Sequence, residues 1–323
     1  MFDMILVVLG LCAFEIISSI DNAVVNADVL GTIRDEKVKK FFLTWGIFFA
    51  IFVVRGVLPF VIFFAANANV GFANALTAMW SGDPAVKHAI EESSPLLLMG
   101  GGMFLLLLCL HWLFLEKKNF GLTLEEPLQR LGSIWFYSFA SVLLPVTIMI
   151  AQRVVDPSKV TNLILAGTIG YCVFFITDGF KQNAEMMEER LMEGQTHDAG
   201  FSDWAKVLFL EIIDLTFSFD GVIGAFAFTL SVPLILLGNG LGAVIVRQLT
   251  VSNVDRIKKY DFLKNGAMYS IGFLGLMMVL EAFGVHIPTW GSPVITFIMI
   301  GYFFYRSVQK NIEQTTLQPQ DAV

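Results

Sequence analysis

Long apolar stretches separated by short polar segments set the pattern of this chain. A run of about 20 apolar residues is long enough to cross a lipid bilayer as a helix. Nine such runs predict an all-α integral membrane protein with about nine transmembrane helices. Their ranges are 3–26, 41–66, 95–116, 132–151, 161–180, 205–229, 231–249, 267–284 and 289–307.

The positions of the basic residues give these spans an orientation. Cytoplasmic loops of membrane proteins are enriched in Lys and Arg. Of the 21 Lys and Arg residues, Lys87, Arg153 and Lys159 fall in loops that would lie outside, and Arg55 lies within the second span. The others lie in inner loops or in the C-terminal tail if the N-terminus is outside. The first span lacks a basic leader and a small-residue cleavage site, so we expect a retained helix rather than a signal peptide.

An internal repeat places acidic residues inside two of the spans. In the first and the sixth span, an acid is followed by Ser four positions later and by Asp two positions after that. A charged Asp at the centre of a membrane helix costs about 3 kcal/mol, so these acids should face a shared interior rather than lipid. The matched residues are Glu15, Ser19 and Asp21 in the first copy and Asp214, Ser218 and Asp220 in the second.

The two copies would run through the membrane in opposite directions, because the first span runs inward and the sixth runs outward. Inverted repeats with polar residues inside the membrane are typical of secondary transporters, whose binding site lies where the repeats meet. The sequence therefore predicts an antiparallel (inverted-topology) internal repeat with a site near the middle of the membrane. A structural polar network between helices is the alternative.

Helix geometry restricts how the acids of the first copy can meet. At 100° per residue, Glu15 and Asp21 lie about 120° apart around a continuous helix, whereas Glu15 and Asn22 share a face. Both acids reach one site only if that site is broad or if the helix breaks near Ser18–Ser19. The second copy offers Gly221 as a break point. Both geometries remain open from the sequence.

Other polar residues could support such a site. Glu211 lies three residues before Asp214, on the same helical face. Arg55 is central in the second span and needs a partner, for which a repeat carboxylate is the expected choice; snorkelling is the alternative. Glu281 lies near the outer end of the eighth span, as a gate, a ligand or an interfacial acid.

The residue types of the repeat favour a particular class of ion. Carboxylate, hydroxyl, amide and carbonyl oxygens suit Mg²⁺, Ca²⁺ and Mn²⁺, whereas zinc and copper sites usually recruit Cys or His. Neither copy of the repeat contains Cys or His. Na⁺ or H⁺ as a coupled counter-ion is compatible with the same residues.

Composition excludes several other classes. The chain is 56% hydrophobic and 15% charged, whereas soluble domains are about a quarter charged. The net charge of −7 argues against a nucleic-acid partner. No P-loop, nucleophile–base pair or His-rich metal motif is recognisable, so we expect neither an enzyme nor a bound prosthetic group.

The order of these features divides the chain into four parts. A first transmembrane repeat with spans 1–3 is followed by two inserted spans and an acidic inner loop at 181–203, in which we expect an amphipathic helix and a turn. The second repeat and the closing spans precede a polar tail that we expect to be disordered. The predicted boundaries are 1–116, 117–204, 205–307 and 308–323.

Several motifs together resemble the TerC superfamily, in particular its branch known as a domain of unknown function. "FEIISSIDNAVV" and "DLTFSFDGVIGA" resemble the two acidic motifs of that family, and Arg55 resembles its second-helix Arg. "MGGGMFLLL" resembles its glycine-containing third helix, and "GFLGLMMVLEAFGVHIP" its closing segment. The resemblance covers most of the chain.

The resemblance implies a divalent-metal transporter, with export of Mn²⁺ as the expected role. The family's tellurite-resistance name describes a phenotype rather than a substrate. This chain has Gly221 where many relatives have Ser, which removes one oxygen ligand. Carried over by motif, the residues that would line the metal path are Glu15, Asp21, Asn22, Asp214 and Asp220, with Ser19, Ser218, Glu211, Arg55 and Glu281 in support.

We therefore expect a secondary transporter of the bacterial inner membrane, multi-pass, with its N-terminus outside and its C-terminus cytoplasmic. Its expected partners are the lipid bilayer, a divalent cation and H⁺ or Na⁺, with a homo-oligomer left open. One alternative is an exporter of a small organic cation or amino acid. The other is a non-transporting membrane scaffold in metal or tellurite stress resistance, for which the 181–203 loop would matter more than the acids.

Overall fold

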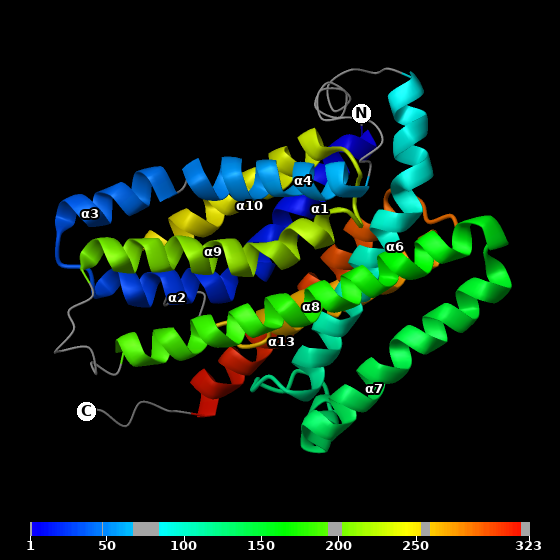
Figure 1. The fold of residues 1–323 in the computed structure, drawn as a ribbon. Helices are drawn as coiled ribbons and strands as arrows, with labels where there is room; N and C mark the ends of the chain where they lie inside the picture. The colour runs from blue at the N-terminus through cyan, green and yellow to red at the C-terminus, as the bar shows by residue number, and fades with distance from the viewer. Residues whose placement is uncertain (1, 47, 67–83, 193–201, 253–258, 318–323) are drawn as a thin grey trace.

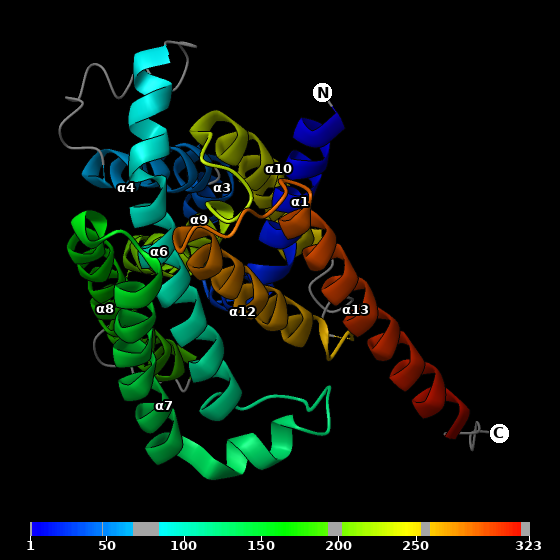
Figure 2. The same cartoon turned by 90° about the vertical axis from the view of Figure 1, so that its right-hand side faces the viewer.

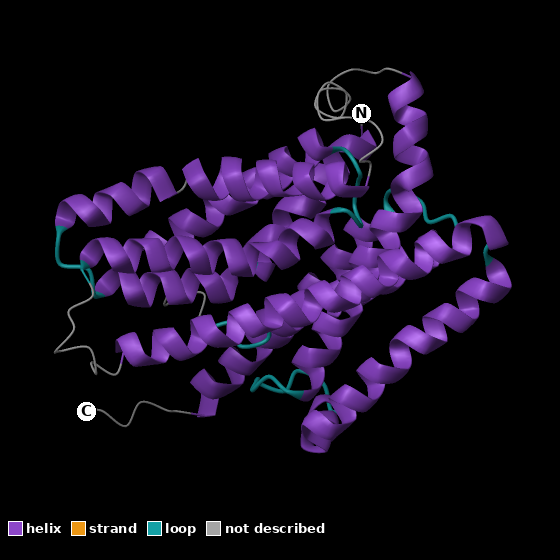
Figure 3. Ribbon diagram, in the orientation of Figure 1, coloured by secondary structure: helices purple, strands orange, loops and turns teal. Residues whose placement is uncertain are grey.

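The protein is built from helices joined by short loops. The computed structural model describes residues 2–46, 48–66, 84–192, 202–252 and 259–317, and no strand occurs in these ranges (Figure 3). The helices, two of them π-helical (η), are α1 Phe2–Ser18, α2 Ile20–Gly31, α3 Glu36–Phe41, η1 Phe42–Gly46, η2 Phe49–Val57, α4 Leu58–Ala66, α6 Pro84–Phe114, α7 Glu125–Val154, α8 Pro157–Met192, α9 Asp203–Ala225, α10 Val232–Ser252, α12 Leu263–Ala282 and α13 Gly291–Leu317.

Helices occupy all nine ranges predicted as spans, and several can cross a membrane. Within the described ranges, four helical segments are long and apolar enough to do so, and α1 with α2, bent by 58° at a short break, would be a fifth. The all-helical prediction is confirmed, whereas the nine spans are not, because α9 carries several charged side chains and α10 has only a shorter apolar segment. The four segments are Ser93–Phe114, Glu125–Val154, Pro157–Met187 and Leu263–Ala282.

Helix α6 is the centre of one half of the molecule, where α7, α8 and α12 pack against it (Figure 2). Its glycines lie at the closest approaches. Gly100 faces Gly170 of α8, and a Cβ on Gly102 would lie 2.9 Å from the carbonyl oxygen of Gly275 in α12. Small residues at such crossings let helix backbones touch, as is usual in membranes. The glycine stretch therefore serves close packing.

The outer surface of α7 and α8 is apolar. Ile134 is 78% exposed, and Trp135, Tyr137 and Phe139 on the same helix are also largely exposed. Such a surface suits lipid rather than water. Helix α8 continues to Met192, so the start of the segment predicted as the 181–203 loop extends the membrane helix; residues 193–201 lie outside the described ranges.

Helix α13 likewise runs on to Leu317, into the segment predicted to be a disordered tail. The helix therefore covers the first part of 308–323, and residues 318–323 lie outside the described ranges. Residues 84–94, predicted as part of an outer loop, form the first turns of α6.

Helices α2 and α9 lie side by side and run in opposite directions (Figure 1). At one end, Asp203 at the start of α9 accepts hydrogen bonds from the backbone N–H groups of Arg34 (3.1 Å) and Asp35 (2.7 Å), which follow α2. The bond from Asp35, aided by that from Arg34, holds the pKa of the Asp203 carboxyl below its usual range. Further along, Asn22 near the start of α2 donates to Asp214 in the middle of α9.

Helix α9, which carries several charged side chains, packs against many other helices. It packs against α1, α2, η2, α10, α8 and α6, and thus joins the two halves of the molecule. Ser202 caps its N-terminus by accepting a hydrogen bond from the backbone N–H of Ala205. The helix continues through Gly221 without a break, so the break point considered there is absent.

The contact between α6 and α8 yields a first prediction. Gly170→Ala would place a methyl group against the Gly100 backbone, and we expect it to destabilise the protein by about 1–3 kcal/mol, the usual cost of overpacking. Gly179→Ala, in the same helix with nothing within 4 Å of the new methyl group, should be neutral or slightly stabilising. Thermal unfolding of both variants in detergent measures the difference, and equal melting temperatures would contradict the packing described here.

Candidate functional site

The first polar motif lies at a break in the helix. Helix α1 ends at Ser18 and α2 begins at Ile20, at the place where the sequence allowed a break. Ser19 donates from its hydroxyl to Glu15 Oε1 (2.6 Å), and the Ser18 hydroxyl donates to the backbone carbonyl of Glu15 (3.3 Å). Serine hydroxyls compete in this way with regular helix geometry, which explains a break at two consecutive serines.

Arg55 joins the acids of the two repeat copies. Its guanidinium donates a hydrogen bond to Glu15 Oε1 in α1, and its Nη1 lies 3.9 Å from Asp214 Oδ2 in α9. Arg55 is 2% exposed and Glu15 is 1% exposed, so the three charges are shielded from water. The expected pairing of Arg55 with repeat carboxylates is therefore present. Its helix, η2, is a π-helix, a form that often occurs at functional sites.

The two copies also contact each other at matched positions. Asn22, seven residues after Glu15, donates from its amide to Asp214 Oδ1 at 2.5 Å. Gly221, seven residues after Asp214, faces Glu15, since a Cβ there would lie 3.0 Å from Glu15 Oε2. In each copy, the residue seven positions after the first acid therefore lies against the first acid of the other copy.

Several oxygen atoms on α1, α2, α9 and α10 have no hydrogen-bond partner among the described residues. All are buried side-chain atoms, and each is a potential ligand oxygen. Buried polar atoms normally find a partner, so a group of open ones needs an explanation. They are Glu15 Oε2, Asn22 Oδ1, Asp214 Oδ2, Ser218 Oγ, Asn26 Oδ1 and Asn239 Oδ1.

Asp220 does not take part in this group. Its carboxylate pairs with Lys181 of α8, and both side chains are 13% exposed. The prediction that all four repeat acids converge on one site is therefore not met for Asp220, because α9 stays straight and turns Asp220 toward α8. Asp21 lies in α2, but its side chain is outside what the structure describes.

The predicted placement of basic residues in inner loops is wrong for Lys181 and Arg247. Both were expected in inner loops, yet Lys181 lies within α8 and Arg247 lies buried in α10. Asp178 precedes Lys181 by three residues, but it lies 3.3 Å from His111, and Lys181 pairs with Asp220. Helix α8 is longer than its apolar segment, so the sequence misplaced its inner end.

Glu211 lies one helical turn away from the centre formed by Glu15, Arg55 and Asp214, rather than within it. Glu211 and Arg247 both border Gly46 of η1, and Arg247 is close enough to Glu211 and Asp214 to interact electrostatically with both. Arg247 also donates to the carbonyl oxygen of Phe42 (2.9 Å) and stacks over its ring. Glu211 therefore borders the charged centre on the side of α10 and η1.

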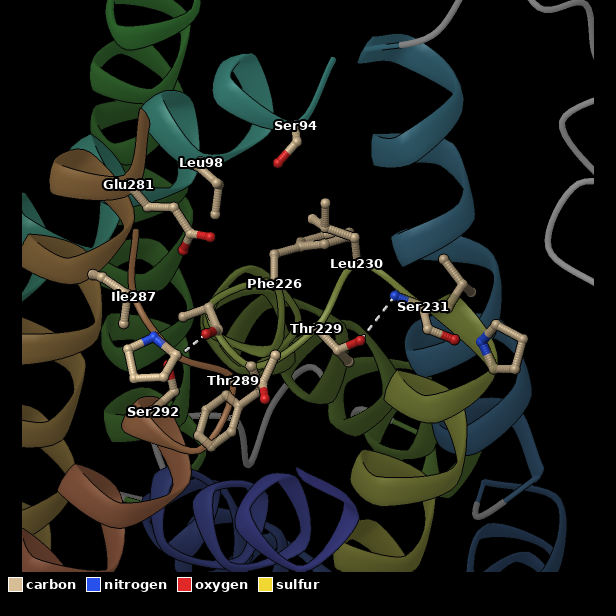
Figure 4. A pocket seen from close by; sticks show the side chains of 15 residues that line it. Ser94, Leu98, Phe226, Thr229, Leu230, Ser231, Glu281, Ile287, Thr289 and Ser292 are labelled. Atoms are coloured by element: carbon tan, nitrogen blue, oxygen red, sulfur yellow. Dashed lines mark hydrogen bonds between the residues drawn. The ribbon is translucent and has the colours of Figure 1, made fainter. Parts of the chain in front are cut away.

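Glu281 lies at a different place in the fold. It lines a cavity of about 420 Å³ where α9 and α12 end and where α10 and α13 begin (Figure 4). Its position at the end of the eighth predicted span is as expected, but the structure places it on this cavity rather than against Arg55.

In the described conformation, Arg55 lies where a cation would have to bind in order to contact both carboxylates. Among the described residues, no three side chains of His, Cys, Asp or Glu converge in the manner of a metal site. Glu15 and Asp214 are the two carboxylates present, and Arg55 occupies the space between them. The oxygen ligands available are thus two carboxylates, the Asn22 amide and nearby hydroxyls, as expected for a hard cation.

Asn26 and Asn239 are polar residues that the sequence analysis did not single out. Both are buried, and Asn239 donates to the backbone carbonyl of Gly221 at 3.4 Å. Asn26 follows Asn22 by one helical turn, and Asn239 interrupts an apolar predicted span. An amide side chain at an otherwise apolar position of a predicted span is the sequence signal that would have pointed to both.

Comparisons with known proteins give a family and a membrane protein as a relative, and neither match names an activity. A family model described as "Protein of unknown function (DUF475)" matches residues 20–314. The chain is 32% identical over 119 residues to the "Uncharacterized membrane protein YceF" of Bacillus subtilis (strain 168), a match that covers 35% of this chain and 45% of that protein. No solved structure matches. The TerC resemblance stays a prediction, since neither match carries that name.

The buried ion pairs yield a second prediction. Arg55→Gln leaves two buried carboxylates without their cation, and we expect a loss of about 3–5 kcal/mol in unfolding free energy. Adding Glu15→Gln removes one of those charges and should restore part of the loss. Arg130→Gln breaks an exposed pair with Glu126 and should cost less than about 1 kcal/mol. Denaturant titration in detergent gives all three values; a similar effect of Arg55→Gln and Arg130→Gln would contradict the buried network.

Proposed function

The chain belongs to the family described as protein of unknown function (DUF475), and we propose that it is a secondary transporter that exports a hard divalent cation, with Mn²⁺ the first candidate. Its multi-pass helical architecture is the premise of the proposal. The cation path would run through the centre formed by Glu15, Arg55 and Asp214.

The observation that carries the proposal is the group of buried oxygen atoms around Arg55. Glu15 Oε2, Asn22 Oδ1 and Asp214 Oδ2 are shielded from water and accept no hydrogen bond from the described residues. A purely structural network would be expected to satisfy them, because open buried acceptors are costly. Hard divalent cations bind oxygen ligands of these kinds, so a cation would use the atoms that the protein leaves open.

The relation between the two repeat copies supports transport rather than storage of the ion. Helices α2 and α9 are antiparallel, and their matched residues contact each other reciprocally. Transporters with inverted repeats alternate access by rocking one repeat against the other around a midplane site. The break at Ser19 gives the first copy a hinge that α9 lacks.

Arg55 gives the proposed cycle its resting state. In the described conformation its guanidinium takes the place of a bound cation by neutralising Glu15 and partly neutralising Asp214. Entry of a divalent cation would make the centre net positive unless Arg55 withdraws, so cation and Arg55 compete for the same carboxylates. Return of Arg55, with protonation of a carboxylate, would then release the cation.

The remaining parts of the proposal concern coupling and topology. H⁺ or Na⁺ would supply the driving force. Nine spans with the N-terminus outside and the C-terminus in the cytoplasm of a bacterium fit the bent α1–α2 pair and the polar α9, which would be shielded from lipid by its neighbours. Export of a small organic cation or amino acid, and a role as a non-transporting membrane scaffold, remain the alternatives.

Flux through reconstituted protein tests this function. We expect Mn²⁺ uptake into proteoliposomes by the wild type, reduced at least tenfold by Glu15→Gln or Asp214→Asn, because each removes a ligand charge. Asp156→Asn, which changes an exposed carboxylate between α7 and α8, is the matched control and should transport normally. Competition by Mg²⁺, Ca²⁺ and Zn²⁺ gives the selectivity.

Two results would contradict the proposal. Normal Mn²⁺ flux in both site variants would show that the cation path does not pass through this centre. No flux of any divalent cation through folded, inserted wild-type protein would remove the metal-transport function and favour one of the alternatives.

A further inference from the structure

An open cavity lined by both polar and apolar side chains lies apart from the Arg55 centre. It has a volume of about 420 Å³ and is bordered by the ends of α9 and α12, the starts of α10 and α13, and Ser94 and Leu98 of α6. Figure 4 shows the Glu281 carboxylate and the Ser94 hydroxyl pointing into this space. Two helices end and two begin here, so their dipoles roughly offset one another and Glu281 sets the sign of the local field.

The cavity wall is a surface for a cation. The Glu281 carboxylate forms no hydrogen bond or ion pair within the described part of the chain, and the exposed His286 is close enough to interact with it electrostatically. No Lys or Arg is among the described residues that line the cavity. Hydroxyl groups of Thr229, Ser231 and Thr289 add further oxygen atoms to the wall.

The size of the cavity indicates the form of that cation. A water molecule takes about 30 Å³, so a cavity of about 420 Å³ has room for an ion together with its first shell of water. Divalent ions such as Mg²⁺ give up their water reluctantly and are often held through one or two carboxylates. A single carboxylate surrounded by hydroxyls suits a hydrated ion that binds weakly and leaves readily.

The cavity lies next to the proposed path, behind an apolar barrier. Phe226, which lines it, follows Gly221 by five residues, roughly 7.5 Å along a helix, and Gly221 faces Glu15. The ring of Phe228 packs against Phe14 with 5.6 Å between centroids, and both rings are buried. Aromatic side chains therefore separate the Glu15 centre from the cavity in the described conformation.

We propose that this cavity is a vestibule in which Glu281 binds the hydrated divalent cation after it leaves, or before it enters, the Arg55 centre. The proposal rests on the proposed function for the identity of the ion. The vestibule would raise the local cation concentration at one end of the path. The aromatic barrier at Phe14 and Phe228 would prevent a continuous connection between the two sites.

Binding of Mn²⁺ to purified full-length protein tests the vestibule, with the loss of the free-ion EPR signal as the readout. In an Asp214→Asn background, which disables the Arg55 centre, we expect a weak site that remains. Glu281→Gln should weaken this site at least fivefold, and Glu281→Asp should largely retain it. Thr289→Lys, which adds a positive charge at an exposed lining position, should weaken it without altering Glu281. Asp3→Asn, an exposed acid that does not line the cavity, is the control.

The outcomes separate the vestibule from the transport function. If the wild type transports Mn²⁺ but Glu281→Gln and Thr289→Lys leave the weak site unchanged, the vestibule is wrong and the transport proposal stands. If no flux occurs but the weak site depends on Glu281, the vestibule stands as a cation site and the transport proposal fails. A weak site that Asp3→Asn removes equally would also overturn the assignment.

Discussion

The rest of the structure depends on one interaction, the buried contact of Arg55 with Glu15 and Asp214. A carboxylate or guanidinium alone at this depth would cost several kcal/mol, so the three side chains are stable there only together. The contact fixes α1, η2 and α9 relative to one another, although they are far apart in sequence. Two carboxylates and one guanidinium leave the group with one more negative than positive charge, as the proposed binding of a cation would require.

The break between α1 and α2 follows from the same requirement. In a straight helix, Glu15 and Asn22 would lie on one face, about 10.5 Å apart along the axis. The serines at the break bond to Glu15, and the bend then carries Asn22 to Asp214. Helix α9 needs no bend, because Gly221 presents no side chain and lets Glu15 lie against its backbone.

Much of this could be predicted from the sequence, because apolar runs and misplaced charges are both local signals. The helices and the pairing of Arg55 with carboxylates of the two acidic motifs follow from such signals, and Ser18–Ser19 was one place where the sequence allowed a break. The partner of Asp220 could not be predicted, since it depends on how far α8 extends past its apolar segment and on the rotation of α9. The placement of Glu281 on a separate cavity likewise depends on where four helix ends meet in space.

The most direct test of the central claim is a structure determined with Mn²⁺ bound, with the ion located by its anomalous scattering. We expect a peak between the carboxylates of Glu15 and Asp214, with the Arg55 guanidinium withdrawn from both. A protein saturated with Mn²⁺ in which Arg55 still holds both carboxylates, and in which the peak lies elsewhere, would contradict it.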